Sequence, residues 1–255
     1  MADSVLTQRI FDGKYLRCTI FGTGPGLFAT FDNFVIGKAE FADCSASRKI
    51  IAAGFRQIVI QTARNDWYLN DELAPLLGAV SKVCNAVGPA KALGFSMGAF
   101  GALIFAPALR VDELFLVSPR FPRPMGWTGV AKINCSEALL APDWQDRLGD
   151  AASAAPRSVV FFDPRHLDDR MAARWLERAS PKVKTVGVAF GGHPCTKYIN
   201  LSGNFGQLQR LLLEQPTGYA GIFKLKKAAR RKSDAYLSRL ADYLDSRKRR
   251  IGAVK

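Results

Sequence analysis

The feature that most constrains this chain is the run G-F-S-M-G at residues 94–98, which lies between an apolar segment and a stretch of small residues. Residues 91–95 predict a buried strand, and residues 98 to about 109 predict a helix. Because the two glycines lack a Cβ, strand and helix can approach closely and Ser96 can occupy a strained backbone region. A helix N-cap would also suit a serine, but a cap does not need glycine on both sides. The pattern therefore predicts an exposed and activatable hydroxyl at Ser96.

An acidic residue and a histidine follow two later apolar segments. Asp163 comes directly after the apolar run 158–162, and His193 follows the run 183–190 after two glycines. Serine, acid and histidine in this chain order, each placed after a strand, are typical of the α/β-hydrolase fold. Asp163 could instead be a turn residue, in which case Asp168 is the substitute acid.

These three residue types suit nucleophilic catalysis. A serine hydroxyl is a poor nucleophile until a base takes its proton, and His193 is the candidate base. Asp163 would hold the imidazole in the required tautomer and stabilise the imidazolium. An oxyanion hole would need two backbone donors, and Met97, the residue after the nucleophile, is the first candidate. The second is expected in the loop 32–34 after an early strand, where Asn33 is the candidate, and a plain turn residue is the alternative for it.

Aromatic and basic residues near the predicted strand ends are candidates for substrate contact. Trp67 and Tyr68 could supply stacking surface at the mouth of the site, or each could be buried in the core. Arg120 follows a predicted strand end and could hold an anionic substrate, or could be a solvated arginine. His166 lies in a run of charged residues and is expected on the solvated surface.

Strands alternate with helices over most of the chain. This alternation predicts an α/β fold with a mostly parallel, doubly wound sheet of the α/β-hydrolase type, covered on both faces. An N-terminal hairpin is expected to turn at residues 12–13, where the sequence reads Asp-Gly. We expect one hydrolase domain over residues 1–215, with a small lid at about 119–156. In such a sheet, ligands bind at the carboxyl ends of the strands, where the three candidate residues are predicted.

The net charge of +14 is concentrated in the C-terminal segment 216–255. That segment holds twelve lysines and arginines against three aspartates, a net charge of +9. An apolar stripe at helical spacing predicts one basic amphipathic helix from about 222 to 249. Its basic face could be simply solvated, or could dock through residues 222–255 on an anionic membrane, a glycan or an acidic protein. A nucleic-acid partner is not predicted, since no recognition module is evident.

Composition limits the remaining possibilities. No run of about 18 apolar residues suggests a membrane span, and the N-terminal segment lacks the pattern of a signal peptide. The five cysteines are scattered without a C-x-x-C pair, so neither disulfides nor a zinc site is predicted. A reducing cytosol is the expected location, with peripheral membrane association as a variant. No cofactor or metal is expected, because the two histidines lie in unrelated contexts.

Short motifs along the chain resemble one branch of the α/β-hydrolase superfamily, the small bacterial hydrolase-like proteins linked to surface polysaccharide systems. The resemblance covers residues 27–213, and Ala99 is a departure, since these proteins often have a second glycine there. The motifs are Asn65-Asp66-Trp67-Tyr68, Gly94-Phe95-Ser96-Met97-Gly98, Phe162-Asp163-Pro164 and Gly192-His193.

The resemblance implies a serine hydrolase that cleaves an ester through an acyl-serine intermediate. It further implies a small acyl group on a carbohydrate or a similar polar alcohol as the substrate. The same residues could instead transfer the acyl group to an alcohol, since water exclusion and acceptor binding decide between the two outcomes. They could also hydrolyse a thioester or an amide. The alternative from another class is a catalytically silent binding protein that acts through its basic tail. The intact set of serine, acid and histidine argues against it, and the tail, which is not part of the hydrolase pattern, argues for it.

Overall fold

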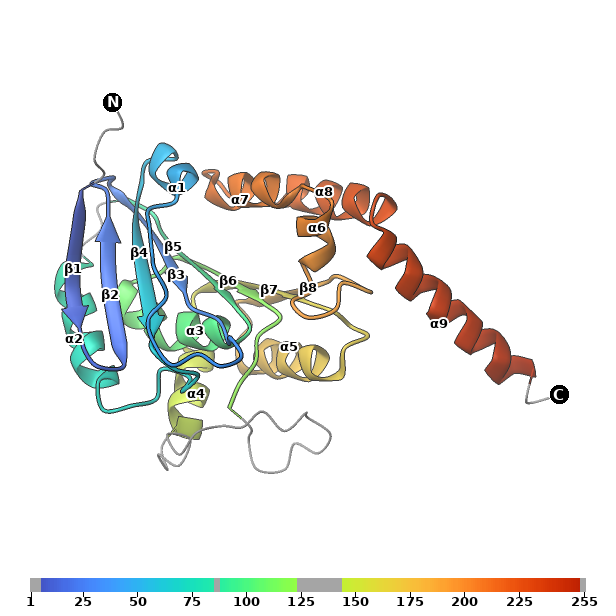
Figure 1. The fold of residues 1–255 in the computed structure, drawn as a ribbon, viewed down its shortest axis with the longest axis horizontal. Helices are drawn as coiled ribbons and strands as arrows, with labels where there is room; N and C mark the ends of the chain where they lie inside the picture. Colours follow the sequence, from blue (N-terminus) through green and yellow to red (C-terminus); the bar gives the residue numbers. More distant parts are fainter. Residues whose placement is uncertain (1–5, 85–87, 123–143, 253–255) are drawn as a thin grey trace.

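The computed structural model describes residues 6–84, 88–122 and 144–252, which form a sheet covered by helices on both faces (Figure 1). Within these residues the sheet has eight strands in the order β1-β2-β4-β3-β5-β6-β7-β8. The strands are β1 Thr7–Asp12, β2 Leu16–Phe21, β3 Gly26–Phe31, β4 Phe55–Thr62, β5 Ala90–Phe95, β6 Glu113–Val117, β7 Arg157–Phe162 and β8 Val183–Gly187. The helices are α1 Arg48–Ala52, α2 Leu73–Val83, α3 Met97–Leu109, α4 Trp144–Ser153, α5 Leu167–Ala179, α6 Lys197–Leu201, α7 Phe205–Leu213, α8 Tyr219–Arg231 and α9 Asp234–Gly252.

Strands β3 to β8 run parallel, and β2 is antiparallel to both β1 and β4. This arrangement confirms the predicted mostly parallel sheet and the N-terminal hairpin. Helices α2 to α5 bury their apolar sides on one face of the sheet, and α1, α6, α7 and α8 bury theirs on the other. The sheet is therefore doubly wound, and the carboxyl ends of its parallel strands share one edge.

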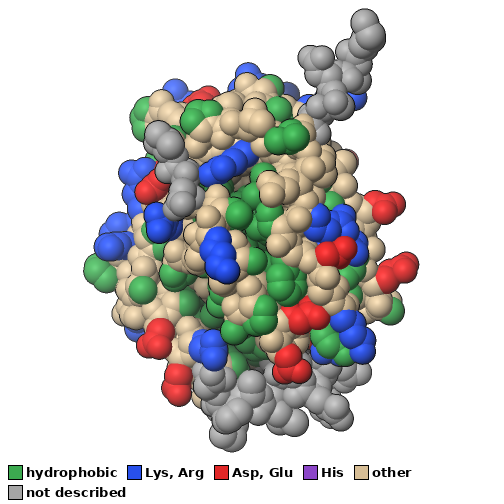
Figure 2. Space-filling view, turned by 90° about the vertical axis from the view of Figure 1, so that its left-hand side faces the viewer, with side chains coloured by type: hydrophobic (Ala, Val, Ile, Leu, Met, Phe, Trp, Pro, Cys, Tyr) green, Lys and Arg blue, Asp and Glu red, His purple; other side chains and the backbone are tan. Residues whose placement is uncertain are grey.

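The outer edge of the sheet at β1 is protected by charge. Asp12 lies 2.7 Å from the guanidinium of Arg17 and 3.2 Å from that of Arg9. Side chains of both signs are interspersed with apolar ones on this side of the molecule (Figure 2). Charged edge strands of this kind resist pairing with another chain.

The amino ends of β5 and β6 hold a buried ion pair. Lys91 is the second residue of β5, and its Nζ lies 3.0 Å from Glu113, which begins β6. The same Nζ donates to the carbonyls of Leu212 and Glu214 and to the hydroxyl of Thr217. A single side chain from the sheet thus fastens the connection between α7 and α8.

The C-terminal segment differs from the single helix expected over 222–249. The structure has two helices, α8 and α9, separated at residues 232–233. The Ser233 hydroxyl accepts a hydrogen bond from the Tyr236 N–H at 3.3 Å, as an N-cap does, so a new helix begins there. Helix α9 leads away from the sheet (Figure 1).

The expected lid at 119–156 includes residues 123–143, which lie outside the described residues. Its final part is α4, whose Trp144 and Leu148 are buried in the core beside α3. That part is a core helix rather than a cover. Among the described residues, none of the helices combines the length and apolar character needed to cross a bilayer.

Candidate active site

Ser96 occupies a sharp turn between β5 and α3. Its backbone has φ 52° and ψ −119°, a region that L-residues rarely adopt. The Ser96 N–H donates to the Val117 carbonyl at 3.0 Å, and its own carbonyl accepts from the Arg120 N–H at 3.2 Å. A Cβ at Gly98 would lie 2.7 Å from the Asp32 carbonyl, and one at Gly94 would collide with the Gly98 carbonyl. The two glycines therefore permit the close approach that the sequence predicted.

The Ser96 hydroxyl meets the predicted histidine. His193 Nε2 lies 2.9 Å from Ser96 Oγ, and Nδ1 of the same ring lies 3.0 Å from Asp169 Oδ1. An ionised carboxylate can only accept, so Nδ1 carries the hydrogen and Nε2 of the neutral ring is left as an acceptor. Nε2 is thereby free to take the hydroxyl proton.

The acid beside His193 is Asp169, which corrects the expectation of Asp163 or its substitute Asp168. Both Asp163 oxygens are occupied by backbone N–H groups, those of Arg165 at 2.8 Å, Phe190 at 3.2 Å and Gly192 at 2.8 Å. Asp163 thus forms an Asx turn after its strand and shapes the loop that carries the histidine. Asp168 points instead to Arg120, with which it forms an ion pair.

Asp169 is fully buried and well supported. Its Oδ2 accepts a hydrogen bond from the Ser118 hydroxyl, which in turn accepts from the Cys195 N–H at 2.8 Å. Burial alone would raise the pKa of Asp169, but hydrogen bonds from His193 and Ser118 outweigh it, and the pKa lies below its usual value. The carboxylate is therefore held in its charged form. Ser118 links the acid to the histidine loop and was not singled out from the sequence.

A second histidine lies against the first, contrary to its expected place on the solvated surface. The rings of His166 and His193 are 5.7 Å apart and tilted by 37°. His166 Nε2 lies 3.2 Å from an Arg120 nitrogen, and Nδ1 lies 3.3 Å from Asp169 Oδ1. A guanidinium only donates, so His166 Nε2 is an acceptor there. Arg120 thus belongs to the charged surroundings of Asp169, and its expected role as a free clamp for an anionic substrate is not what its contacts show.

Trp67 and Tyr68 are core residues, which corrects their expected place at the mouth of the site. Their exposed fractions are 1% and 0%. Trp67 packs edge-on against Phe100 at 5.9 Å. The Tyr68 hydroxyl donates to the Asp32 carbonyl at 2.6 Å, so this tyrosine stabilises the loop after β3 from the core side.

The two expected oxyanion donors lie on elements that meet beside the serine. Met97 is the first residue of α3, and N–H groups in a first helical turn have no acceptor within the helix. Asn33 is exposed in the loop after β3, which the Gly98 contact places against the start of α3. Their role in binding an oxyanion stays a prediction.

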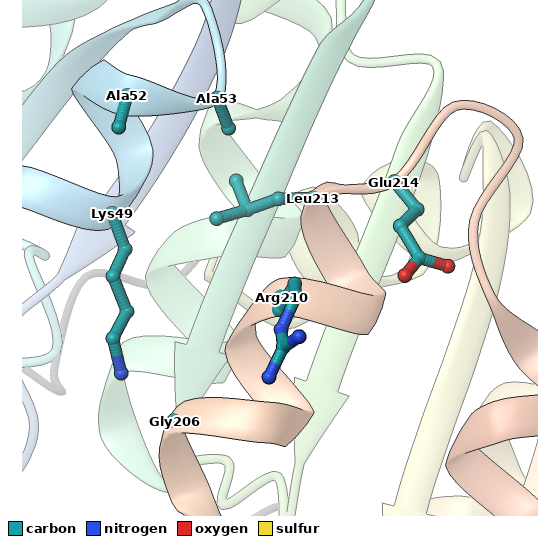
Figure 3. A pocket seen from close by; sticks show the side chains of 7 residues that line it. All are labelled: Lys49, Ala52, Ala53, Gly206, Arg210, Leu213 and Glu214. Carbon is teal, nitrogen blue, oxygen red and sulfur yellow. The ribbon is translucent and has the colours of Figure 1, made fainter.

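Two surface cavities lie at opposite edges of the sheet. One of about 350 Å³ is lined by Asp32, Asn33 and the segment from Val35 to Ala42, on the loop expected to supply the second oxyanion donor. Another of about 440 Å³ lies between α1 and α7, with Lys49 and Arg210 on its walls (Figure 3). Since α1 directly precedes β4, this second cavity is at the amino edge of the strands, opposite Ser96.

No protein-family model matches this chain, and no curated protein sequence matches it. Several solved structures are similar at low identity. A capsule O-acetyltransferase of Neisseria meningitidis serogroup A is 13% identical over 77% of this chain and 93% of that chain, with a TM-score of 0.47. Est1E from Butyrivibrio proteoclasticus is 14% identical over 80% of this chain and 98% of that chain, also at 0.47. Esterase Pf2001 of Pyrococcus furiosus is 12% identical over 82% of this chain and 91% of that chain, with a TM-score of 0.46.

These identities and TM-scores are too low to transfer a function. The assignment of fold therefore depends on the strand order, the parallel crossovers and the serine turn between β5 and α3.

Proposed function

We propose that this chain, which has the α/β-hydrolase fold, is a serine hydrolase that cleaves an ester through an acyl-serine intermediate. Ser96 is the nucleophile, His193 the general base and acid, and Asp169 the residue that orients the imidazole. The observation that carries the proposal is the 2.9 Å contact between Ser96 Oγ and His193 Nε2 on a backbone with positive φ. A helix cap needs neither that strain nor a histidine partner.

The acylation step follows from this geometry. The Ser96 hydroxyl proton moves to His193 Nε2 while Oγ bonds to the ester carbonyl carbon, which gives a tetrahedral oxyanion. Asp169 stabilises the resulting imidazolium through Nδ1. Collapse of the intermediate breaks the bond to the leaving oxygen, which takes the proton from Nε2. Water then attacks the acyl-serine by the same route in reverse.

The oxyanion is proposed to bind the backbone N–H groups of Met97 and Asn33. Donors of this kind act on charge that develops in the transition state, and removing one typically costs about 10²- to 10³-fold in kcat. Because both donors are backbone groups, side-chain substitution tests them poorly. The chemistry of Ser96 is the more direct target.

Labelling with a fluorophosphonate probe tests the nucleophile. We expect wild-type protein and Ser81→Ala, a control serine exposed on α2, to be labelled equally. Ser96→Ala should show no labelling, and its ester turnover should fall by about 10⁴-fold or more. Equal labelling of Ser96→Ala and wild type would exclude this mechanism. A folded wild type that is not labelled would support a silent hydrolase-fold protein.

The substrate class is the finer part of the proposal. The motif resemblance favours a small acyl group, such as acetyl, on a carbohydrate hydroxyl. An acetylated sugar and an aryl acetate, offered with and without a free polyol, separate hydrolysis from acyl transfer. Release of free acetate at the same rate in both conditions supports hydrolysis, whereas acetylated polyol at the expense of acetate supports acyl transfer.

A further inference from the structure

The outer face of α8 combines cations with an exposed aromatic ring. The inner face is buried through Ile222, Leu225 and Ala229. Phe223 is 50% exposed on the other side of the helix. Around it lie the exposed cations of what we call the α8 basic face, namely Lys224, Lys227, Arg231 and Lys232.

This face is presented rigidly. The Lys226 ammonium, on the flank of α8, donates to the Gly187 carbonyl at the end of β8 at 3.0 Å. The Tyr198 hydroxyl of α6 lies 3.5 Å from the Lys226 carbonyl. A helix held by its inner side and one flank needs little reorganisation to offer its outer side to a partner.

The charge on this face has one sign. Helix α8 contains no acidic residue, and none of the cations on its outer face is paired with a carboxylate in the described part of the chain. The opposite end of the molecule, at the β1 edge, mixes both signs (Figure 2). A surface that keeps an unneutralised field attracts an anionic partner over a Debye length.

We propose that the α8 basic face docks on an anionic phospholipid bilayer. Each lysine or arginine near such a surface gains electrostatic attraction, and an exposed phenylalanine inserts at the level of the headgroups. The ring of Phe223 explains why a bilayer is favoured over a free polyanion, because headgroups lie above apolar chains that can receive it. Nucleic acid and acidic protein would use the cations but gain less from an isolated ring.

Vesicle flotation with the full-length protein tests this docking. We expect binding to phosphatidylcholine vesicles that contain phosphatidylglycerol, and none to phosphatidylcholine alone. The variant Lys224→Glu/Lys227→Glu/Arg231→Glu should bind at least about 100-fold more weakly, and Phe223→Ser several-fold more weakly. The matched control Lys82→Glu/Arg174→Glu/Lys182→Glu makes the same charge change at exposed positions elsewhere. It should retain most of the binding, and circular dichroism checks that every variant is folded.

Three results would overturn the proposal. Wild-type protein that floats with neither vesicle lacks the docking function. Equal losses in the two triple variants would mean that net charge alone drives the association. Tight binding to single-stranded RNA, with the same dependence on Lys224, Lys227 and Arg231 but no vesicle binding, would assign the face to nucleic acid instead.

A separate observation concerns the other C-terminal helix, α9, and the loop that carries His193. Arg239 Nη1 of α9 donates to the Phe190 carbonyl at 3.0 Å. The Phe190 ring packs against Tyr236 and Tyr243 of α9, at 5.7 and 5.6 Å. Phe190 itself has φ 61°, so its backbone is strained and must be held by its neighbours.

The backbone of Phe190 is held by hydrogen bonds at both its N–H and its carbonyl. Asp163 accepts the Phe190 N–H at 3.2 Å, and Arg239 donates to the carbonyl of the same residue. We infer that Arg239 is a positioning residue that fixes the loop and, through it, the imidazole of His193. This inference rests on the proposed serine chemistry, since it predicts a defect in that chemistry.

The experiment compares Arg239→Ala with Lys248→Ala, which removes one exposed positive charge from the same helix. We expect Arg239→Ala to lower kcat and the rate of fluorophosphonate labelling by about 10- to 100-fold, with KM nearly unchanged. Lys248→Ala should match wild type. Arg239→Lys should recover part of kcat, because an ammonium can still donate to the carbonyl.

The outcomes separate the two proposals. Wild-type protein without labelling refutes the serine mechanism itself. Labelled wild type with an equally fast Arg239→Ala refutes the positioning role alone. A loss of thermal stability in Arg239→Ala without any loss of kcat would also overturn it, because Arg239 would then be only structural.

Discussion

Strands β5 and β6 carry a buried polar cluster at each end, and the two clusters are built differently. At the amino ends, Lys91 and Glu113 form an ion pair in which the ammonium has three further acceptors. At the carboxyl ends, Ser96 and Ser118 follow the same two strands, and both have positive φ. Neither Lys91 nor Glu113 has positive φ, whereas the second cluster stores backbone strain.

Solvent access separates the clusters as well. The side chains of Lys91 and Glu113 are 1% and 5% exposed, while that of His193 is 25% exposed. A buried polar group that is fully satisfied adds specificity to the fold, and a strained one that can be reached by a small molecule suits chemistry. The comparison teaches that burial and pairing alone do not mark a site.

The largest expected effect is on kcat, from a substitution in the cluster at the carboxyl ends of β5 and β6. Asp169→Asn should lower kcat by about 10⁴-fold with little change in stability, because the amide can hold His193 in the wrong tautomer. Asp163→Asn should lower kcat less, through a loosened histidine loop. Steady-state kinetics on one ester substrate measures both. If Asp163→Asn were the more damaging variant, the assignment of the acid would be reversed.

The amino end should respond in stability rather than in turnover. Lys91→Met takes the ammonium away from the buried Glu113 carboxylate and leaves it with the Arg157 guanidinium, which is 62% exposed. Breaking a buried ion pair typically costs about 3–5 kcal/mol in the free energy of unfolding. Urea unfolding measures this loss, and kcat of the folded fraction should stay at the wild-type value. Lys91→Met/Glu113→Leu should recover part of the stability, because the cation that then loses its carboxylate, Arg157, is largely exposed to solvent. A large loss of kcat in folded Lys91→Met would break the comparison between the two ends.

The sequence predicted the serine turn and the histidine because both signals are local. Gly94 and Gly98 reveal a close approach of strand and helix, and His193 follows a predicted apolar run within three residues. The acid was mispredicted because the choice depends on the phase of a helix. Adjacent residues on a helix point about 100° apart, so Asp168 reaches Arg120 while Asp169 reaches His193.

The sequence could not decide between the mouth of the site and the core for Trp67 and Tyr68, for a different reason. Both residues have positive φ, and no glycine beside them in the sequence indicates such a backbone conformation. Their turn is fixed by Asp66, a buried carboxylate that accepts hydrogen bonds from the Thr62 hydroxyl and the Tyr68 N–H. Asp66 is adjacent in the sequence, but the sequence does not show that its carboxylate is buried and closes this turn, and tertiary contacts then decide which way the rings point.

Glu72 tests the same comparison between satisfied polar groups and the strained cluster at Ser96, with the smallest expected effect. It is a satisfied carboxylate that does not belong to that cluster. It accepts the N–H groups of Lys14 at 2.7 Å, Tyr15 at 2.9 Å and Leu16 at 2.7 Å, which closes the turn of the β1–β2 hairpin. Burial raises the pKa of Glu72, but the three backbone hydrogen bonds lower it by more than burial raises it. The pKa therefore lies below its usual value of 4.5. A carboxyl group with a lowered pKa stabilises the fold above pH 4.5 and loses that contribution as the pH falls through its folded value.

Glu72→Gln should therefore lower the free energy of unfolding by about 1–2 kcal/mol at neutral pH, because charged hydrogen bonds become neutral ones. The difference from wild type should shrink in acid, where the wild-type carboxyl group is protonated too. Urea unfolding at neutral pH and well below pH 4.5 measures both values, with the exposed Glu40→Gln as control. A difference that stays constant with pH would assign the loss to packing of the side chain rather than to its charge. A fall in ester turnover would contradict the view that Glu72, a satisfied carboxylate on the β1–β2 hairpin, acts on stability alone.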